Sequence, residues 1–340
     1  MNLIGEHTDY NDGLVLPIAL RLGVTVVARA RDDARVTIAT DIDVTPRTAS
    51  FTIGAEEKDG TWADRVRGVT RALALRGARI AGFDAEIASD LPSGAGLGSS
   101  AAFAVAVLRA LRKLFSLTLD DADIVRIAHE AETGPFVGAR SGLLDQLSSA
   151  YGRTNAALLI DLRDLATETV PLPRDLELAV IDSGTRHEHA SGGYNTRRAE
   201  CEAAAHHFGV RSLRDLEDRP LHEILERLPP PLDRRVRHVL TENERVRDAV
   251  AALRARDLAR MGELLDASHR SLRDDYEVST PELDRLVELA HADGDVLGAR
   301  LVGGGFGGSI LALAAAGTAA DAAQRIVARY PDGRLVAVVP

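Results

Sequence analysis

A run of glycines and serines near position 100 is the part of this sequence best suited to bind an anion. Gly94, Gly96 and Gly98 alternate with other residues, and Ser99 and Ser100 follow directly. Glycines let the backbone approach a ligand closely, and a helix that begins here would direct its free N–H groups and positive dipole end at that ligand. Phosphate suits such a loop, and the serine hydroxyls could bind a phosphate oxygen or Mg²⁺.

The spacing of this loop separates it from two common nucleotide-binding patterns. No lysine follows the glycines, which excludes a Walker A loop, and the G-x-G-x-x-G spacing is also missing. The alternative interpretation is a tight turn between a strand and a helix that binds nothing. Three alternating glycines and two serines at a helix start favour the phosphate-binding loop.

A second glycine cluster, at residues 303–308, does contain the G-x-G-x-x-G spacing. The residues that follow, 309–313, are predicted to form a strand, whereas a dinucleotide-binding fingerprint opens a helix. We therefore predict a glycine turn between two strands that packs closely against other backbone or a ligand.

Polar side chains occupy six consecutive positions at residues 6–11. The carboxylates of Glu6 and Asp9 could each accept hydrogen bonds from adjacent hydroxyl groups of a sugar, and the imidazole of His7 adds a donor or an acceptor. A solvated polar turn fits the composition equally well.

Two further carboxylates could take part in chemistry. Asp145 lies in the segment 142–146 beside apolar residues, so it is either a helix cap or a group that orients or deprotonates an attacking hydroxyl. Glu132 lies at the end of a predicted helix and is a candidate metal ligand; the alternative is an ordinary surface position.

The apolar pattern predicts the elements that position these residues. Strands are predicted at 14–30, 36–39, 49–53, 83–87, 156–161, 177–182 and 335–339, with two more around the glycine cluster between 300 and 313. Helices are predicted at about 62–73 with Thr61 as N-cap, at 101–115, at 121–132, and through most of 194–292, with one helix starting at 279–282. Strands and helices do not alternate strictly, so we predict an α+β protein.

Length and composition exclude several classes of protein. The 340 residues suffice for one large or two medium-sized domains, and a net charge of −10 without a long basic tract argues against nucleic-acid binding. The single cysteine, Cys201, cannot form an intramolecular disulfide. Neither a signal peptide nor an apolar run of membrane-spanning length is evident, so we expect a cytoplasmic protein that binds no membrane. The expected partners are small molecules, and we expect a monomer.

The motifs together resemble the galactokinases of the GHMP small-molecule kinase family. Residues 2–11 resemble the galactokinase signature, residues 91–101 the second, phosphate-binding motif, and residues 303–308 the third, glycine-rich motif. Further segments are similar to the family's catalytic-aspartate segment and to other family positions: 142–146, 194–198, 241–246 and 279–283. The resemblance spans nearly the whole chain, and its first motif is specific to galactokinase-like members.

The resemblance implies ATP-dependent phosphorylation of galactose at its anomeric hydroxyl, with Mg²⁺, to give galactose 1-phosphate and ADP. It also implies a GHMP kinase fold, with a ribosomal-protein-S5-like N-terminal domain at 1–165 and a ferredoxin-like C-terminal domain at 166–340. Asp145 would be the catalytic residue. The sugar would be bound by Glu6, His7, Asp9, Gly142, Asp145 and Tyr194. ATP would be bound by Pro92, Ser93, Gly94, Ala95, Gly96, Leu97, Gly98, Ser99 and Ser100. The metal would be bound by Ser100 and Glu132.

Two alternatives to galactose phosphorylation stay open at this stage. In the family an arginine stands two residues before the asparagine that matches Asn2, so we expect the recorded chain, which starts at Met1, to be truncated within the motif. Without that charge, which is worth on the order of 10³-fold in rate, the chain could be a non-catalytic galactose- or ATP-binding sensor. The other alternative is a kinase for a related sugar, arabinose or N-acetylgalactosamine.

Overall fold

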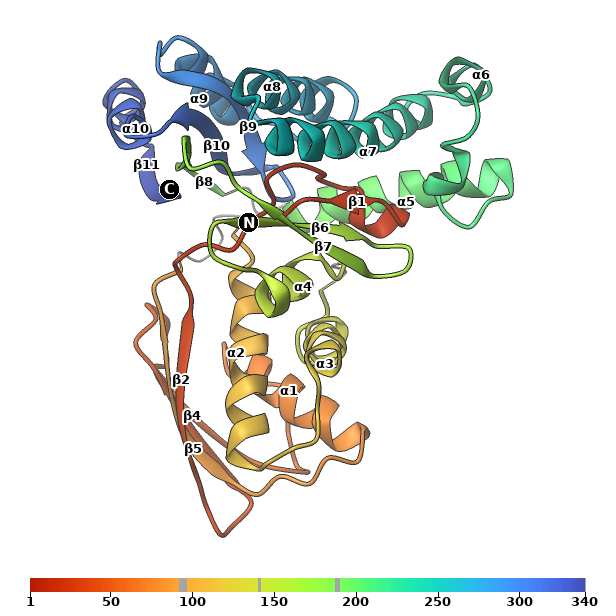
Figure 1. The fold of residues 1–340 in the computed structure, drawn as a ribbon. Helices are drawn as coiled ribbons and strands as arrows, with labels where there is room; N and C mark the ends of the chain where they lie inside the picture. The colour runs from red at the N-terminus through yellow and green to blue at the C-terminus, as the bar shows by residue number, and fades with distance from the viewer. Residues whose placement is uncertain (92–96, 140–141, 187–189, 340) are drawn as a thin grey trace. The chain divides into compact units, whose positions relative to one another are not determined.

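The computed structural model describes residues 1–91, 97–139, 142–186 and 190–339 (Figure 1). These residues form two compact units. We call residues 21–91 and 98–151 the inserted unit, because both ends of the other unit flank it in sequence. Residues 1–20, 97 and 152–339 form the terminal unit.

The inserted unit is a four-stranded sheet with helices on one face (Figure 1). Its strand order is β2-β5-β3-β4; β3 and β5 are parallel and the other pairs are antiparallel. Its elements are β2 (Val24–Ala30), β3 (Arg35–Thr40), β4 (Thr48–Thr52), α1 (Asp64–Leu75), β5 (Phe83–Ser89), α2 (Ser99–Leu114), α3 (Asp121–Thr133) and α4 (Leu144–Tyr151).

The core of the inserted unit follows the apolar periodicity. Phe83, Ala85 and Ile87 alternate along β5 and are buried, because alternate side chains of a strand point to the same face. They pack in one cluster with the apolar faces of α1, α2 and α3, which include Val69 and Leu108. The predicted strand at 83–87 and the helical face between 62 and 73 are confirmed.

The predicted N-cap of α1 was wrong. The helix begins at Asp64, with Ala63 at the N-cap position, and Thr61 lies one turn earlier. The carboxylate of Asp64 instead accepts N–H groups of the preceding loop, from Asp59 at 3.2 Å and Gly60 at 2.8 Å. An acidic residue in the first turn also interacts favourably with the helix dipole, so a threonine cap is not needed here.

The terminal unit contains two antiparallel sheets, β1-β6-β7 and β11-β8-β10-β9. Apolar side chains of α5, α7, α8, α9 and α10 pack in one core with the second sheet (Figure 1). Its strands are β1 (Leu14–Val15), β6 (Ala156–Asp161), β7 (Ala166–Pro171), β8 (Leu176–Arg186), β9 (Val296–Val302), β10 (Gly307–Ala315) and β11 (Arg334–Val339). Its helices are η1 (Asp9–Asn11), α5 (Ala190–Phe208), η2 (Leu213–Leu216), α6 (Leu221–Leu225), α7 (Leu232–Ala255), α8 (Leu258–Asp274), α9 (Pro281–His291) and α10 (Ala319–Ala328).

The predicted strand at 14–30 is two separate strands. β1 pairs with β6 in the terminal unit, and β2 pairs with β5 in the inserted unit. Pro17 lies in the interruption, and proline has no N–H to continue a ladder. The apolar pattern runs on through the interruption because Leu16 and Ile18 are buried although they lie outside the strands.

Other predicted elements agree with the structure. Thr280 caps α9 with its hydroxyl, and Pro281 takes the first helical position. β9 ends directly before the glycine cluster at 303–308 and β10 begins within it, at Gly307, so the predicted turn between two strands is confirmed. Within the described residues, no helix is both long enough and apolar enough to cross a membrane.

Candidate active site

The loop of residues 2–13 in the terminal unit is fastened to helix α7. The N–H of Gly5 donates to Glu242 at 3.0 Å, and the N–H of Leu14 donates to the side-chain oxygen of Asn243 at 2.8 Å. Burial alone would raise the pKa of Glu242, but the charges of Arg245 and His238 outweigh it and lower the pKa to about 2. Glu242 is therefore an ionised anchor for the loop.

Glu6 joins this loop to the glycine cluster. Its carboxylate accepts the N–H of Gly303 at 2.8 Å and the side-chain amide of Asn2 at 3.1 Å. The guanidinium of Arg300, which is wholly buried, lies 2.8 Å from the same carboxylate. Burial raises the pKa of Glu6, and Arg300 opposes this effect. The buried carboxylate of Glu6 thus joins the segment 2–11 to the glycine cluster at 303–308.

His7 is a neutral imidazole with one defined tautomer. Its Nε2 lies 3.2 Å from the carbonyl oxygen of Gly304, and its Nδ1 lies 2.9 Å from the hydroxyl of Tyr10. A carbonyl can only accept, so the proton is on Nε2 and Tyr10 donates to Nδ1. Burial, together with a smaller effect of the nearby His238, lowers the pKa of His7 to about 3.

The hydroxyl of Tyr10 continues into a buried chain of hydrogen bonds. It lies 2.8 Å from the hydroxyl of Tyr276, which lies 3.1 Å from the sulfur of Cys201. Because Tyr10 gives its proton to His7, Tyr276 must donate to Tyr10 and the Cys201 thiol to Tyr276. All three hydrogen bonds of this series donate toward His7, and together they hold its ring in place.

Asp9 and Tyr194 lie beside His7 and are less buried than Glu6 or His7. The Tyr194 hydroxyl donates to Asp9 at 3.5 Å, and the rings of His7 and Tyr194 have centroids 5.3 Å apart. The structure therefore brings together four of the residues predicted to bind sugar. Because Asp9 and Tyr194 are less buried than Glu6 and His7, they are the better placed to contact sugar hydroxyls.

In the inserted unit, Asp145 lies against the start of helix α2. Gly98 precedes the helix with φ +69°, and a Cβ built there would come within 2.9 Å of Asp145 Oδ1. A glycine is needed both for the left-handed conformation and for this close approach. Desolvation raises the pKa of Asp145. Gly142 lies in the same unit, two residues before α4.

Glu132 and its neighbours form a compact group of oxygen ligands. Gln146 donates its side-chain amide to the Glu132 carboxylate. Burial raises the pKa of Glu132; the hydrogen bonds of Ser100 and Gln146 oppose this, and the charge of Asp145 adds to it. Arg65 donates from Nε to the Ser100 hydroxyl oxygen at 3.2 Å.

The chemistry of this group fits a magnesium ion. Carboxylate, hydroxyl and amide oxygens are the ligands Mg²⁺ prefers, and the Oε1 atom of Gln146 is buried with no hydrogen-bond partner among the described residues. The described residues contain no cluster of three or more His, Cys, Asp or Glu that could hold a metal by itself. Protein sites for Mg²⁺ commonly supply one or two carboxylates and leave the other positions to phosphate and water.

The predicted ATP-binding residues are only partly described. Pro92, Ser93, Gly94, Ala95 and Gly96 lie outside the described residues. Leu97 is buried, Gly98 precedes α2, and Ser99 and Ser100 are its first two residues. The free N–H groups of that first turn fit the predicted role toward phosphate.

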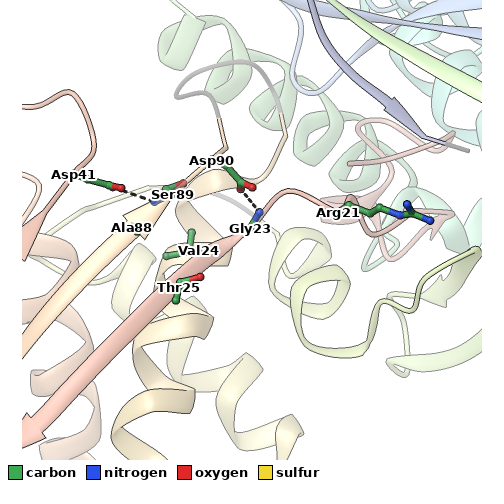
Figure 2. A pocket seen from close by; sticks show the side chains of 8 residues that line it. All are labelled: Arg21, Gly23, Val24, Thr25, Asp41, Ala88, Ser89 and Asp90. Carbon is green, nitrogen blue, oxygen red and sulfur yellow. Dashed lines mark hydrogen bonds between the residues drawn. The ribbon is translucent and has the colours of Figure 1, made fainter. Parts of the chain in front are cut away.

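A pocket of about 380 Å³ opens in the inserted unit where β2 begins and β5 ends (Figure 2). Asp90 accepts the N–H of Gly23 and Asp41 accepts that of Ser89, while the Arg21 side chain points away from the other labelled residues (Figure 2). The pocket is lined by Arg21, Gly23, Val24, Thr25, Asp41, Ala88, Ser89 and Asp90. Among the described residues, none of those predicted from sequence to bind sugar, ATP or metal lines it.

Comparison with known proteins decides the family. Models of the GHMP kinases N terminal domain and the GHMP kinases C terminal domain match residues 64–153 and 249–332, and the galactokinase galactose-binding signature matches residues 1–30. The crystal structure of Lactococcus lactis galactokinase complexed with galactose is 33% identical, covers 98% of this chain and 90% of its own, and has a TM-score of 0.91. The chain belongs to the galactokinase family of GHMP kinases. It is accordingly a sugar kinase, and the predicted family, GHMP kinase fold and enzyme class are confirmed.

More distant GHMP kinases share the fold alone. The L. major mevalonate kinase, solved with R-mevalonate, is 21% identical with a TM-score of 0.67, and covers 99% of this chain and 93% of its own. The Streptococcus pneumoniae phosphomevalonate kinase, solved with phosphomevalonate and AMPPNP, is 14% identical with a TM-score of 0.72, and covers 99% of this chain and 96% of its own.

Several residues that contact the predicted site residues within each unit were not singled out from the sequence. Arg300, Tyr276 and Arg65 carry no motif signal, because each acts through contacts with residues distant in the chain. Glu242 was found only as part of the segment 241–246, without a role. Gln146 directly follows Asp145, and this adjacency in the motif was the one available signal for it.

Proposed function

We propose that the chain phosphorylates galactose at its anomeric hydroxyl with ATP, giving galactose 1-phosphate and ADP. The observation that carries the proposal is the cluster of Glu6, His7, Asp9 and Tyr194, built from the segment that matches the galactose-binding signature. The 33% identity to a galactokinase solved with galactose supports the same substrate.

The cluster has the chemistry to select a sugar. The Asp9 carboxylate can accept two hydroxyl donors, and the Tyr194 hydroxyl can donate or accept. Glu6, held by Arg300 and Gly303, and His7, held by Gly304 and Tyr10, add a preorganised surface. Binding groups that are already fixed lose little conformational freedom when the sugar binds.

Asp145 is the residue we assign to the transfer step. Its carboxylate would accept the proton of the anomeric hydroxyl as that oxygen bonds to the γ-phosphorus of ATP, and the bond to the bridging oxygen would break to release ADP. The raised pKa of Asp145 makes its ionised form a stronger base than an ordinary aspartate.

The start of α2 would receive the nucleotide phosphates. Ser100 and Glu132 would hold Mg²⁺, with Gln146 beside them. When bound, the ion would neutralise charge on the phosphate oxygens. The protein's own part is to supply the N–H groups after Gly98 and to keep Glu132 oriented.

The test is sugar-dependent formation of ADP by the purified chain, with galactose, arabinose and N-acetylgalactosamine compared. We expect galactose to give the highest kcat/KM. Asp145→Asn should still bind galactose in calorimetry, while kcat falls about 10²- to 10⁴-fold, the usual contribution of a general base. Asp43→Asn, at a fully exposed carboxylate, is the matched control and should behave as the wild type.

The outcomes separate the proposal from its competitors. Galactose binding without any ADP formation by the wild type would indicate a sensor, and a clear preference for arabinose or N-acetylgalactosamine would change the substrate. Unchanged turnover by Asp145→Asn would remove that residue from the mechanism.

A further inference from the structure

We propose that Arg65 is a nucleotide-binding residue, whose guanidinium contacts the phosphate chain of ATP at the start of helix α2. This inference rests on the proposed function, because it concerns the ATP of the same reaction. None of the segments that carry the family resemblance includes Arg65, and the position is found only from its contacts.

The geometry places Arg65 directly at the phosphate-binding end of α2. Arg65 is the second residue of α1, and its Nε donates to the Ser100 hydroxyl oxygen at 3.2 Å. Ser100 is in turn the second residue of α2. The two terminal nitrogens of Arg65 make no hydrogen bond to any described residue, so no described residue occupies four of its five N–H donors.

Arg65 forms no close ion pair with a described residue, in contrast to its neighbour Arg67, although its charge opposes the rise of the Glu132 pKa. Arg67 lies 2.7 Å from Asp59 and 2.8 Å from Asp64, and its side chain is buried, so its charge serves the structure. No carboxylate among the described residues lies within ion-pair distance, 4.0 Å, of Arg65. Its side chain is partly exposed.

The surroundings of Arg65 favour an anionic ligand that brings a cation. The first turn of α2 has no acidic residue, and its N–H groups and dipole attract anions. Beside it, Gln146 is almost fully buried, donates to Glu132, and leaves its Oε1 without a partner among the described residues. An unsatisfied buried oxygen next to a carboxylate suits a metal ion, whereas the free donors of Arg65 suit phosphate oxygens.

A purely structural role makes a different prediction. If Arg65 only fastened α1 to α2 through Ser100, its loss would lower stability and weaken every ligand of the site to a similar extent. If Arg65 contacts phosphate, its loss should instead lower the affinity for ATP and ADP and leave the affinity for adenosine unchanged. The two roles are therefore distinguished by whether the loss of affinity depends on the number of phosphates in the ligand.

The experiment is calorimetric titration of the full chain with ATP, ADP and adenosine, with MgCl₂ and with EDTA, in the absence of sugar. Arg65→Met should raise the Kd for ATP about tenfold to a hundredfold, as expected for loss of a charge-assisted contact, and should not change the Kd for adenosine. Arg65→Lys should recover part of the ATP affinity. Arg71→Met, at an exposed position of the same helix, is the matched control.

A second readout is galactose affinity, which should be the same in Arg65→Met and wild type. The inference is overturned if Arg65→Met binds ATP as tightly as the wild type, or if its affinity for adenosine falls by the same factor as its affinity for ATP. In either case, ATP binding and galactose phosphorylation by the wild type would leave the proposed function standing. A wild-type chain that binds no ATP would overturn both.

Discussion

The guanidinium of Arg300 lies fully buried against the carboxylate of Glu6, with 2.8 Å between Nη2 and Oε1. The same guanidinium donates to the carbonyl of Leu3 at 2.8 Å. Strand β9 thus holds the start of the galactose-binding signature from within the core of the terminal unit. A buried ion pair of this kind adds little net stability, but removal of one partner leaves the other charge uncompensated.

Arg300→Met should therefore be strongly destabilising. We expect the free energy of unfolding to fall by about 3–5 kcal/mol, because Glu6 would stay buried without its counter-charge. Urea denaturation measures this. Arg29→Met breaks an exposed ion pair with Asp84 and should cost less than about 1 kcal/mol. An equal effect of both substitutions would contradict the role assigned to Arg300.

Gly98→Ala should impair catalysis. The new Cβ would lie within 2.9 Å of Asp145 Oδ1, so the carboxylate must move. A displacement of about 1 Å in a catalytic group can lower kcat about a hundredfold. Galactose affinity should change much less than kcat. The measurements are steady-state kinetics and galactose titration.

Gly138→Ala is the matched control for this prediction. Gly138 also has a positive φ, +76°, but a Cβ there meets no atom of the described residues within 4 Å. Both variants carry backbone strain of about 1 kcal/mol, and Gly98→Ala alone disturbs Asp145. If the two variants lose the same activity, the contact with Asp145 is not the cause.

Tyr276→Phe should weaken galactose binding with little effect on kcat. It removes the donor to Tyr10 and thereby loosens the chain that fixes His7, at a cost of about 0.5–1.5 kcal/mol. The expected result is a several-fold rise in the galactose Kd. Tyr330→Phe, which loses one longer hydrogen bond of 3.4 Å to Ser183, should leave galactose binding unchanged.

Acid should destabilise the chain through its buried histidines. Burial lowers the pKa of His7 to about 3 and that of His238 to about 4, from 6.5. The unfolded chain therefore binds more protons below pH 6.5, so this stability is fully present above pH 6.5 and is lost as pH falls toward 4. Each group should contribute about 1.4 kcal/mol per pH unit in that window.

Urea unfolding at pH 7, 6 and 5 checks this pH dependence. His238→Gln should reduce the slope by the contribution of one proton. His291→Gln should leave the slope between pH 6 and 5 nearly unchanged, because the hydrogen bond to Asp266 raises the pKa of His291 and its contribution changes mainly above pH 6.5. A slope that His238→Gln does not alter would show that the acid sensitivity arises elsewhere.

The sequence alone determined the family, the α+β class and most local elements. The alternation at Phe83, Ala85 and Ile87 and the Thr280–Pro281 helix start depend on periodicity and capping within a few residues. Side chains such as Glu6, Asp9 and Asp145 were likewise found because their motifs are contiguous.

Only the tertiary structure decided how these segments are held. The apolar run at 14–30 divides between two units because its halves pair with different partner strands, β6 and β5. Arg300 meets Glu6 and Arg65 meets Ser100 through packing that no local pattern encodes. Burial and pairing are properties of neighbours in space, so the charge state of His7 and the contact of Arg65 with Ser100 followed only from the folded chain.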